Sequence, residues 1–101
     1  MGVISVNKNE NYIKMSLYHL QDRRLSFKAA GLMSWMLSLP DGFDFSVSNI
    51  TVIRKEGKDA IYTAMKELEK AGYLSLDLNQ HDARWQFYTI YHIHEKPIKR
   101  D

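Results

Sequence analysis

The feature that most constrains the fold is the segment Asp44–Tyr73, in which a glycine separates two runs with helical periodicity. Ser46 can cap the first run, from Val47 to about Ile53, and Gly57 supplies the turn before the second run, from Lys58 to Ala71. Two helices joined by a tight turn form the layout of a helix-turn-helix. We therefore expect the exposed face of the second helix to meet a partner, as when such a helix enters the major groove of DNA.

The second run has one apolar stripe. Its apolar residues recur at helical spacing, namely Ile61, Ala64, Met65, Leu68 and Ala71. Gly72 then ends the helix, since glycine readily takes the left-handed conformation found at helix C-termini. Tyr62, Thr63 and Lys66 fall on the opposite face. The pattern predicts that these three side chains project outward together while the stripe is buried.

Patterns on either side of this segment complete the predicted fold. Ser26 can cap a helix over Phe27–Ser38, and Val3–Val6 has the character of a short extended segment. Leu74–Leu78 alternates apolar and polar residues, and Arg84–Ile93 is a long run rich in aromatic residues. We expect an α+β fold, a winged helix-turn-helix with a three-helix core, a C-terminal β-hairpin wing and a short N-terminal strand.

The chain of 101 residues suits a single domain, residues 1–101, with an N-terminal arm at 1–11 and a flexible tail or linker stub at 95–101. It has no cysteine, which excludes disulfides and fits a cytoplasmic setting. No apolar run approaches the roughly 20 residues of a membrane span, so we expect no membrane partner. The net charge of +2 permits nucleic acid as a partner without requiring it.

Candidate DNA contacts lie on the second helix, in the turn before it and at the hairpin. On the helix, Lys58, Tyr62, Thr63 and Lys66 can reach base edges or phosphates. Arg54 and Lys55 can hold phosphate near the helix N-terminus, and Arg84 can touch the backbone from the wing tip, near His81. The plainer interpretation of the helix face is a solvated surface of Lys/Glu pairs, because residues 46–72 are almost balanced in charge.

The sequence lacks the usual motifs of metal sites and enzymes. His81, His92 and His94 lie close along the chain, but a zinc site needs a supporting ligand set, and strand-surface histidines are the default interpretation. The chain contains no glycine-rich phosphate loop and no nucleophile elbow. We expect no enzymatic activity, no metal and no cofactor.

Three stretches resemble the N-terminal winged-helix domain of phage replication-initiation and replisome-organiser proteins. They are LSFKAAGL at Leu25–Leu32, LSLPDGFDFS at Leu37–Ser46, and the segment from GKDAI to KELEKAGYL at Gly57–Leu74. The resemblance covers about Tyr12 to Tyr91. It implies a module that binds double-stranded origin DNA, or helps to load replication machinery, in the cytoplasm of a bacterial host cell.

A protein-interaction module is the alternative. In that case a homodimer interface, or a patch for a replisome or host protein, is formed by Val52, Tyr62 and the aromatic strand Arg84–Ile93. A phage protein that inhibits a host complex would also belong to this class. The two functions are compatible, because one surface of such a domain can dimerise while another binds DNA.

Overall fold

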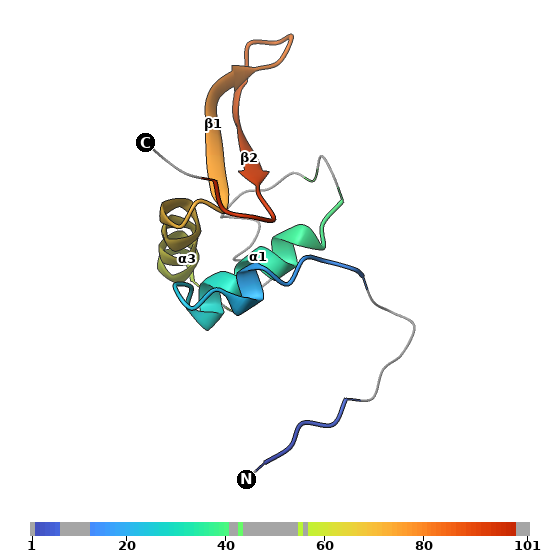
Figure 1. Cartoon of the computed structure of the whole chain (residues 1–101). Helices are drawn as coiled ribbons and strands as arrows, with labels where there is room; N and C mark the ends of the chain where they lie inside the picture. Colours follow the sequence, from blue (N-terminus) through green and yellow to red (C-terminus); the bar gives the residue numbers. More distant parts are fainter. Residues whose placement is uncertain (1, 7–12, 41–42, 44–54, 56, 99–101) are drawn as a thin grey trace.

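The computed structural model describes residues 2–6, 13–40, 43, 55 and 57–98. Its elements are a short 3-10 turn, η1 (His19–Gln21), two helices, α1 (Phe27–Leu37) and α3 (Lys58–Lys70), and two strands, β1 (Leu74–His81) and β2 (Phe87–Ile93). The two helices pack together, and the hairpin of β1 and β2 extends away from them (Figure 1). Within the described residues, no helix has the length and apolar content needed to cross a membrane.

The expectation of a winged helix-turn-helix is wrong. The described residues form an α+β structure with two α-helices and a two-stranded antiparallel sheet, which does not fit a three-helix winged-helix core. The helix expected over Val47–Ile53 lies outside the described residues. The short N-terminal strand is also not found, since Val3–Val6 carries no strand. An extended segment becomes a strand only when a neighbour supplies its hydrogen bonds, and within the described part of the chain β1 and β2 pair only with each other.

The helix α1 begins at the predicted cap. The Ser26 side chain accepts a hydrogen bond from the backbone N–H of Ala29 at 3.1 Å, which satisfies one of the free donors of the first turn. Ala29, Met33 and Met36 are buried, while Leu32, Trp35 and Leu37 pack partly against the same core. The helix is apolar around most of its circumference because it packs against the core on several sides.

The helix α3 ends at Gly72 in a Schellman motif. The N–H of Tyr73 donates to the carbonyl of Leu68 at 2.9 Å, and the N–H of Gly72 donates to Glu69. Gly72 has a φ of 93°, and a Cβ there would lie 2.4 Å from the backbone oxygen of Ile98. Glycine is required at this position both for the left-handed backbone and for the close approach of the C-terminal segment.

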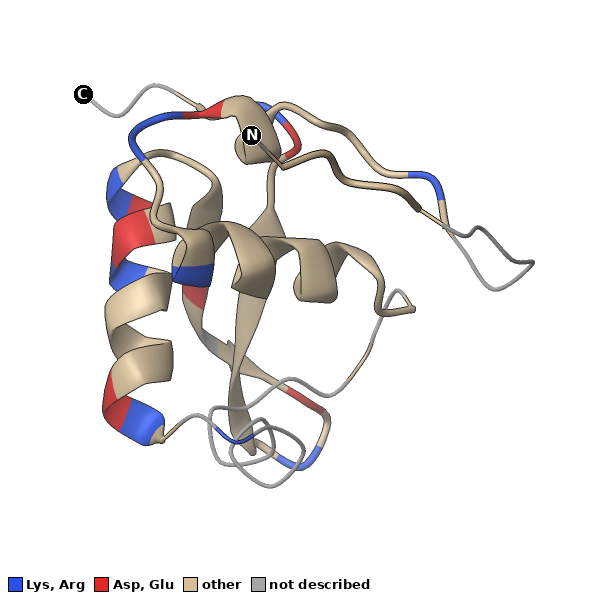
Figure 2. Ribbon diagram, turned by 90° about the horizontal axis from the view of Figure 1, so that it is seen from below, with Lys and Arg blue, Asp and Glu red and all other residues tan. Residues whose placement is uncertain are grey.

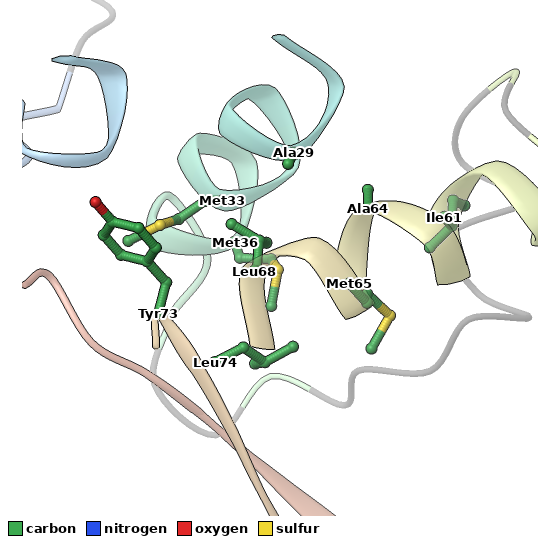
Figure 3. Close-up of a cluster of buried hydrophobic side chains, with 9 residues drawn as sticks. All are labelled: Ala29, Met33, Met36, Ile61, Ala64, Met65, Leu68, Tyr73 and Leu74. Carbon is green, nitrogen blue, oxygen red and sulfur yellow. The ribbon is translucent and has the colours of Figure 1, made fainter. Parts of the chain in front are cut away.

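The core lies where α1, α3 and the first residues of β1 meet (Figure 3). It consists of Ala29, Met33, Met36, Ile61, Ala64, Met65, Leu68, Tyr73 and Leu74. Leu76, Tyr91 and Ile93 from the hairpin pack against its edge. The far half of the hairpin lies beyond this core, so its apolar side chains have no helix to cover them in the described structure.

The first strand of the hairpin is longer than predicted and the second is shorter, since β2 begins at Phe87 and not at Arg84. The strand β1 continues through His81, which pairs with Phe87, and a bulge between Asp77 and Gln80 shifts the register. The turn therefore falls at 82–86, whereas the two sequence patterns place it between Leu78 and Arg84. A bulge breaks the strict period of two on which the prediction rested.

Candidate nucleic-acid interface

The outward face of α3 has the predicted composition. Tyr62 is 49% exposed, and Thr63 and Lys66 are also exposed. On the opposite side, Ile61 and Leu68 are buried in the core. The burial pattern confirms that the helix turns its polar face to solvent. A recognition helix needs such an exposed face.

Lysine predominates at the exposed positions of α3, which are Lys58, Asp59, Tyr62, Thr63, Lys66 and Lys70. Asp59 is the only carboxylate in this exposed set. Figure 2 shows the basic and acidic residues interleaved along the helix, since Glu67 and Glu69 occupy its flanks. The exposed face is thus mildly positive, and it is not a continuous basic stripe.

Glu67 is turned toward α1. Its carboxylate accepts the backbone N–H of Ser26 at 2.5 Å and the Ser26 hydroxyl at 2.9 Å. In a common capping box, a Glu from the same helix fills this role. In α1 the third residue, where the capping box has its Glu, is Ala29, which has no carboxylate. Glu67 of α3 supplies the carboxylate instead. This contact holds Glu67 beside the first turn of α1.

The hydroxyl of Thr63 is used within the helix. It donates to the backbone carbonyl of Asp59 at 2.8 Å. A partner can therefore meet the methyl group of Thr63 and the remaining lone pair of its hydroxyl oxygen. This favours an apolar or donor group opposite Thr63, such as a thymine methyl.

The predicted site residues do not all lie together. Lys58, Tyr62, Thr63 and Lys66 share α3, and Lys55, shortly before this helix, is exposed. Arg54 lies outside the described residues. Arg84 is exposed in the hairpin turn, at the end of the hairpin remote from α3 (Figure 1). The structure thus brings together the helix residues and separates them from the hairpin residue.

Two exposed aromatic positions differ from the sequence interpretation, which placed Phe27 in an apolar helix and Trp85 in the aromatic strand Arg84–Ile93. Phe27, the first residue of α1, is 99% exposed. It looked like the start of an apolar helix, and only the packing shows that it faces solvent. Trp85, in the hairpin turn, is 70% exposed and has a φ of 61°. No local sequence signal marks a tryptophan for that backbone conformation.

The three histidines near the hairpin have separate partners. A ring nitrogen of His94 lies 2.9 Å from the Ser75 hydroxyl, and His92 lies 3.7 Å from the carboxylate of Asp77. His81 stacks on Trp85. The described residues contain no cluster of three or more His, Cys, Asp or Glu side chains suited to a metal ion.

A hydrogen-bond network around Tyr73 engages Arg24, a basic residue outside the candidate site. The hydroxyl of Tyr73, a fully buried residue, donates to Asp22 at 2.5 Å, and Arg24 pairs with the same carboxylate at 2.7 Å. The hydrogen bonds from Arg24 hold the pKa of Asp22 well below its ordinary value, and burial raises the pKa of Tyr73 to about 12. Arg24 is thus engaged in holding the segment before α1 against the end of α3.

Comparison with protein-family models, with curated proteins and with solved structures finds no match to this chain. The resemblance to phage replication-initiation and replisome-organiser proteins therefore stays a prediction.

Proposed function

We propose that this chain binds double-stranded DNA through the exposed face of α3. The observation that supports the proposal is the composition of that face, where Lys58, Lys66 and Lys70 flank Tyr62 and Thr63. Lysines neutralise phosphates, and the residues between them can meet base edges. This surface of α3 could contact DNA without a winged-helix fold, since the lysines and the residues between them share one face of a single helix.

The dimensions of α3 suit the proposed contact. The helix has 13 residues and is therefore about 20 Å long, and the major groove of B-DNA, about 12 Å wide, admits an α-helix. With the buried stripe packed on α1 and β1, the opposite face is free to enter a groove. Lys58 lies at one end of the helix and Lys70 at the other, so they can reach phosphates at separate points.

The family resemblance supports a narrower proposal, that the bound DNA serves phage-type replication in a bacterial host. The protein-interaction alternative has its own support, because Phe27 and the hairpin side chains Leu78, Phe87 and Tyr88 are exposed. Light scattering of the purified protein tests the dimeric form of this alternative. If the protein is strictly monomeric, those side chains can serve an interface only with a different protein.

Fluorescence anisotropy with a labelled duplex tests the DNA proposal. If Lys55, Lys58, Lys66 and Lys70 each contact one phosphate, affinity should fall about a hundredfold between about 50 and 200 mM salt. Lys58→Gln/Lys66→Gln should weaken binding and reduce the salt slope by about two.

The matched control, Lys14→Gln/Lys96→Gln, removes the same charge from exposed residues outside α3. It should retain the steeper slope. Absence of duplex binding at low salt, or equal losses in the two double variants, would refute the proposal.

A further inference from the structure

The hairpin turn holds Trp85 in a left-handed backbone conformation, which is unfavourable for a non-glycine residue. The side chain of Asp82 accepts hydrogen bonds from the N–H groups of Arg84 and Gln86, at 2.8 and 3.1 Å. The Trp85 N–H donates to the Asp82 carbonyl at 3.0 Å, and the Asp82 N–H donates to Gln86. Four hydrogen bonds thus determine the turn and fix the direction of the Trp85 side chain. Strain held in this way is commonly found where a side chain must be presented to a ligand.

The aromatic rings at the turn form an ordered stack. The rings of His81 and Trp85 are nearly parallel, with centroids 4.2 Å apart and an interplanar angle of 15°. Phe87 meets the edge of His81 at 6.2 Å and is 70% exposed. We call His81, Trp85 and Phe87 the tip cluster. His81 supports the indole from one side while most of the indole surface remains open to solvent.

A cation adjoins this stack in the sequence. Arg84, adjacent to Trp85, is exposed, and within the described part of the chain no carboxylate lies within ion-pair distance of its guanidinium. The nearest carboxylate along the chain, that of Asp82, already accepts two backbone hydrogen bonds. An open ring face and an exposed cation on adjacent residues are complementary to a nucleobase with its phosphate.

We propose that the tip cluster binds single-stranded nucleic acid, with an unpaired base stacked on Trp85 and the adjacent phosphate paired with Arg84. Base stacking on exposed aromatic side chains is tolerant of sequence and is how many proteins hold single strands. The nature of the partner rests on the proposed function of α3, whose excess of lysine suits the same polyanion. A protein partner is the competing occupant, and the experiment below separates the two.

Intrinsic fluorescence of the full chain provides the test, with an oligothymidylate as the probe. The chain has two tryptophans, Trp35 and Trp85. A base stacked on Trp85 should quench its emission, while Trp35, half-buried against the core, should be unaffected. Trp85→Leu should abolish the quenching and weaken binding by about five- to a hundredfold, the range expected for one stacked base. Trp85→Phe should retain most of the affinity, because it keeps a ring.

Phe27→Leu is the matched control, since it removes an exposed aromatic ring from the start of α1. It should leave the quenching and the affinity unchanged. Arg84→Gln should lower the salt slope for the single strand by about 0.7, the contribution of one phosphate contact. Circular dichroism spectra that match those of the original protein would show that each variant is folded.

The outcomes distinguish this proposal from the one on α3. Trp85→Leu should retain duplex binding, and Lys58→Gln/Lys66→Gln should retain quenching by the oligothymidylate, although at reduced affinity. Absence of quenching, or quenching that persists in Trp85→Leu, would overturn the tip-cluster proposal whatever the duplex result. A dimer that Trp85→Leu dissociates, without quenching by the single strand, would overturn it in favour of self-association.

Discussion

Replacing Glu67 by alanine should loosen the junction between α1 and α3. The carboxylate accepts two hydrogen bonds from Ser26, one from its N–H and one from its hydroxyl, and it places a negative charge at the N-terminus of α1. Hydrogen bonds to a charged group contribute about 1.5–3 kcal/mol each when buried. Ser26 is exposed, so solvent reduces that contribution, and we expect a total loss of about 1–2 kcal/mol.

The assay is thermal and urea unfolding followed by circular dichroism. For a domain of this size, each kcal/mol lowers Tm by about 4–8 °C, so Glu67→Ala should lower it by about 4–16 °C. Lys66→Ala, at the adjacent exposed position, serves as the control and should change Tm little. Glu67→Gln should fall between the two, because its amide oxygen can still accept from the Ser26 N–H.

A double-mutant cycle with Ser26→Ala isolates the hydrogen bond from the Ser26 hydroxyl to Glu67, because alanine keeps the backbone N–H. Ser26→Ala also removes the hydrogen bond that the Ala29 N–H donates to the Ser26 hydroxyl. The losses of unfolding free energy in the two single variants therefore share only the bond between the Ser26 hydroxyl and Glu67. We expect a coupling of about 1 kcal/mol. Additivity within about 0.3 kcal/mol would show that the Ser26 hydroxyl adds nothing to the contact. A Tm for Glu67→Ala equal to that of Lys66→Ala would refute the reasoning that α3 supplies the cap of α1.

Three further predictions concern the buried network, acid stability and the turn. Tyr73→Phe should destabilise the fold by about 1–2 kcal/mol, measured by urea unfolding, because it removes the only buried hydroxyl donor to Asp22 in the described structure. Burial lowers the pKa of His19 from 6.5, so the unfolded chain binds a proton at this residue more readily than the folded chain does. Tm should therefore fall as the pH drops below about 6.5. The variant His19→Gln should show a smaller fall in Tm over the same pH range. A second loss should begin below about pH 3.8, where protonation of unfolded Asp22 takes effect. Trp85→Gly should leave the free energy of unfolding unchanged or raise it by up to about 1 kcal/mol, since glycine adopts a positive φ without steric cost; a larger loss would show that the indole serves folding.

Part of the pH prediction depends on an unusual burial. His19 is fully buried, with one ring nitrogen 2.7 Å from the Ser34 hydroxyl and the other, Nδ1, without a hydrogen-bond partner in the described structure. A charged imidazole there would lack a compensating group, which is why the neutral form is favoured. The same contact attaches η1 to α1.

The sequence by itself determined the local elements. The Ser26 cap, the buried stripe of α3 and the glycine stop at Gly72 are all present, because each signal acts within a turn or two of the chain. The outward position of Tyr62, Thr63 and Lys66 follows from the same periodicity, so most of the candidate site was predictable. The sequence also predicted Arg84 as part of that site, but it gave no indication that Arg84 lies far from α3.

Only the tertiary structure decided how those elements combine. The three-helix winged-helix core was wrong, and neither the Glu67 cap on α1 nor the Tyr73–Asp22 contact could be anticipated, because their partners lie far apart in sequence. Trp85 shows the same limit within one turn, since hydrogen bonds to the Asp82 carboxylate from the N–H groups of Arg84 and Gln86 impose a backbone that its own preference opposes. Periodicity and capping are properties of neighbouring residues, whereas packing and shared caps arise only when distant segments meet.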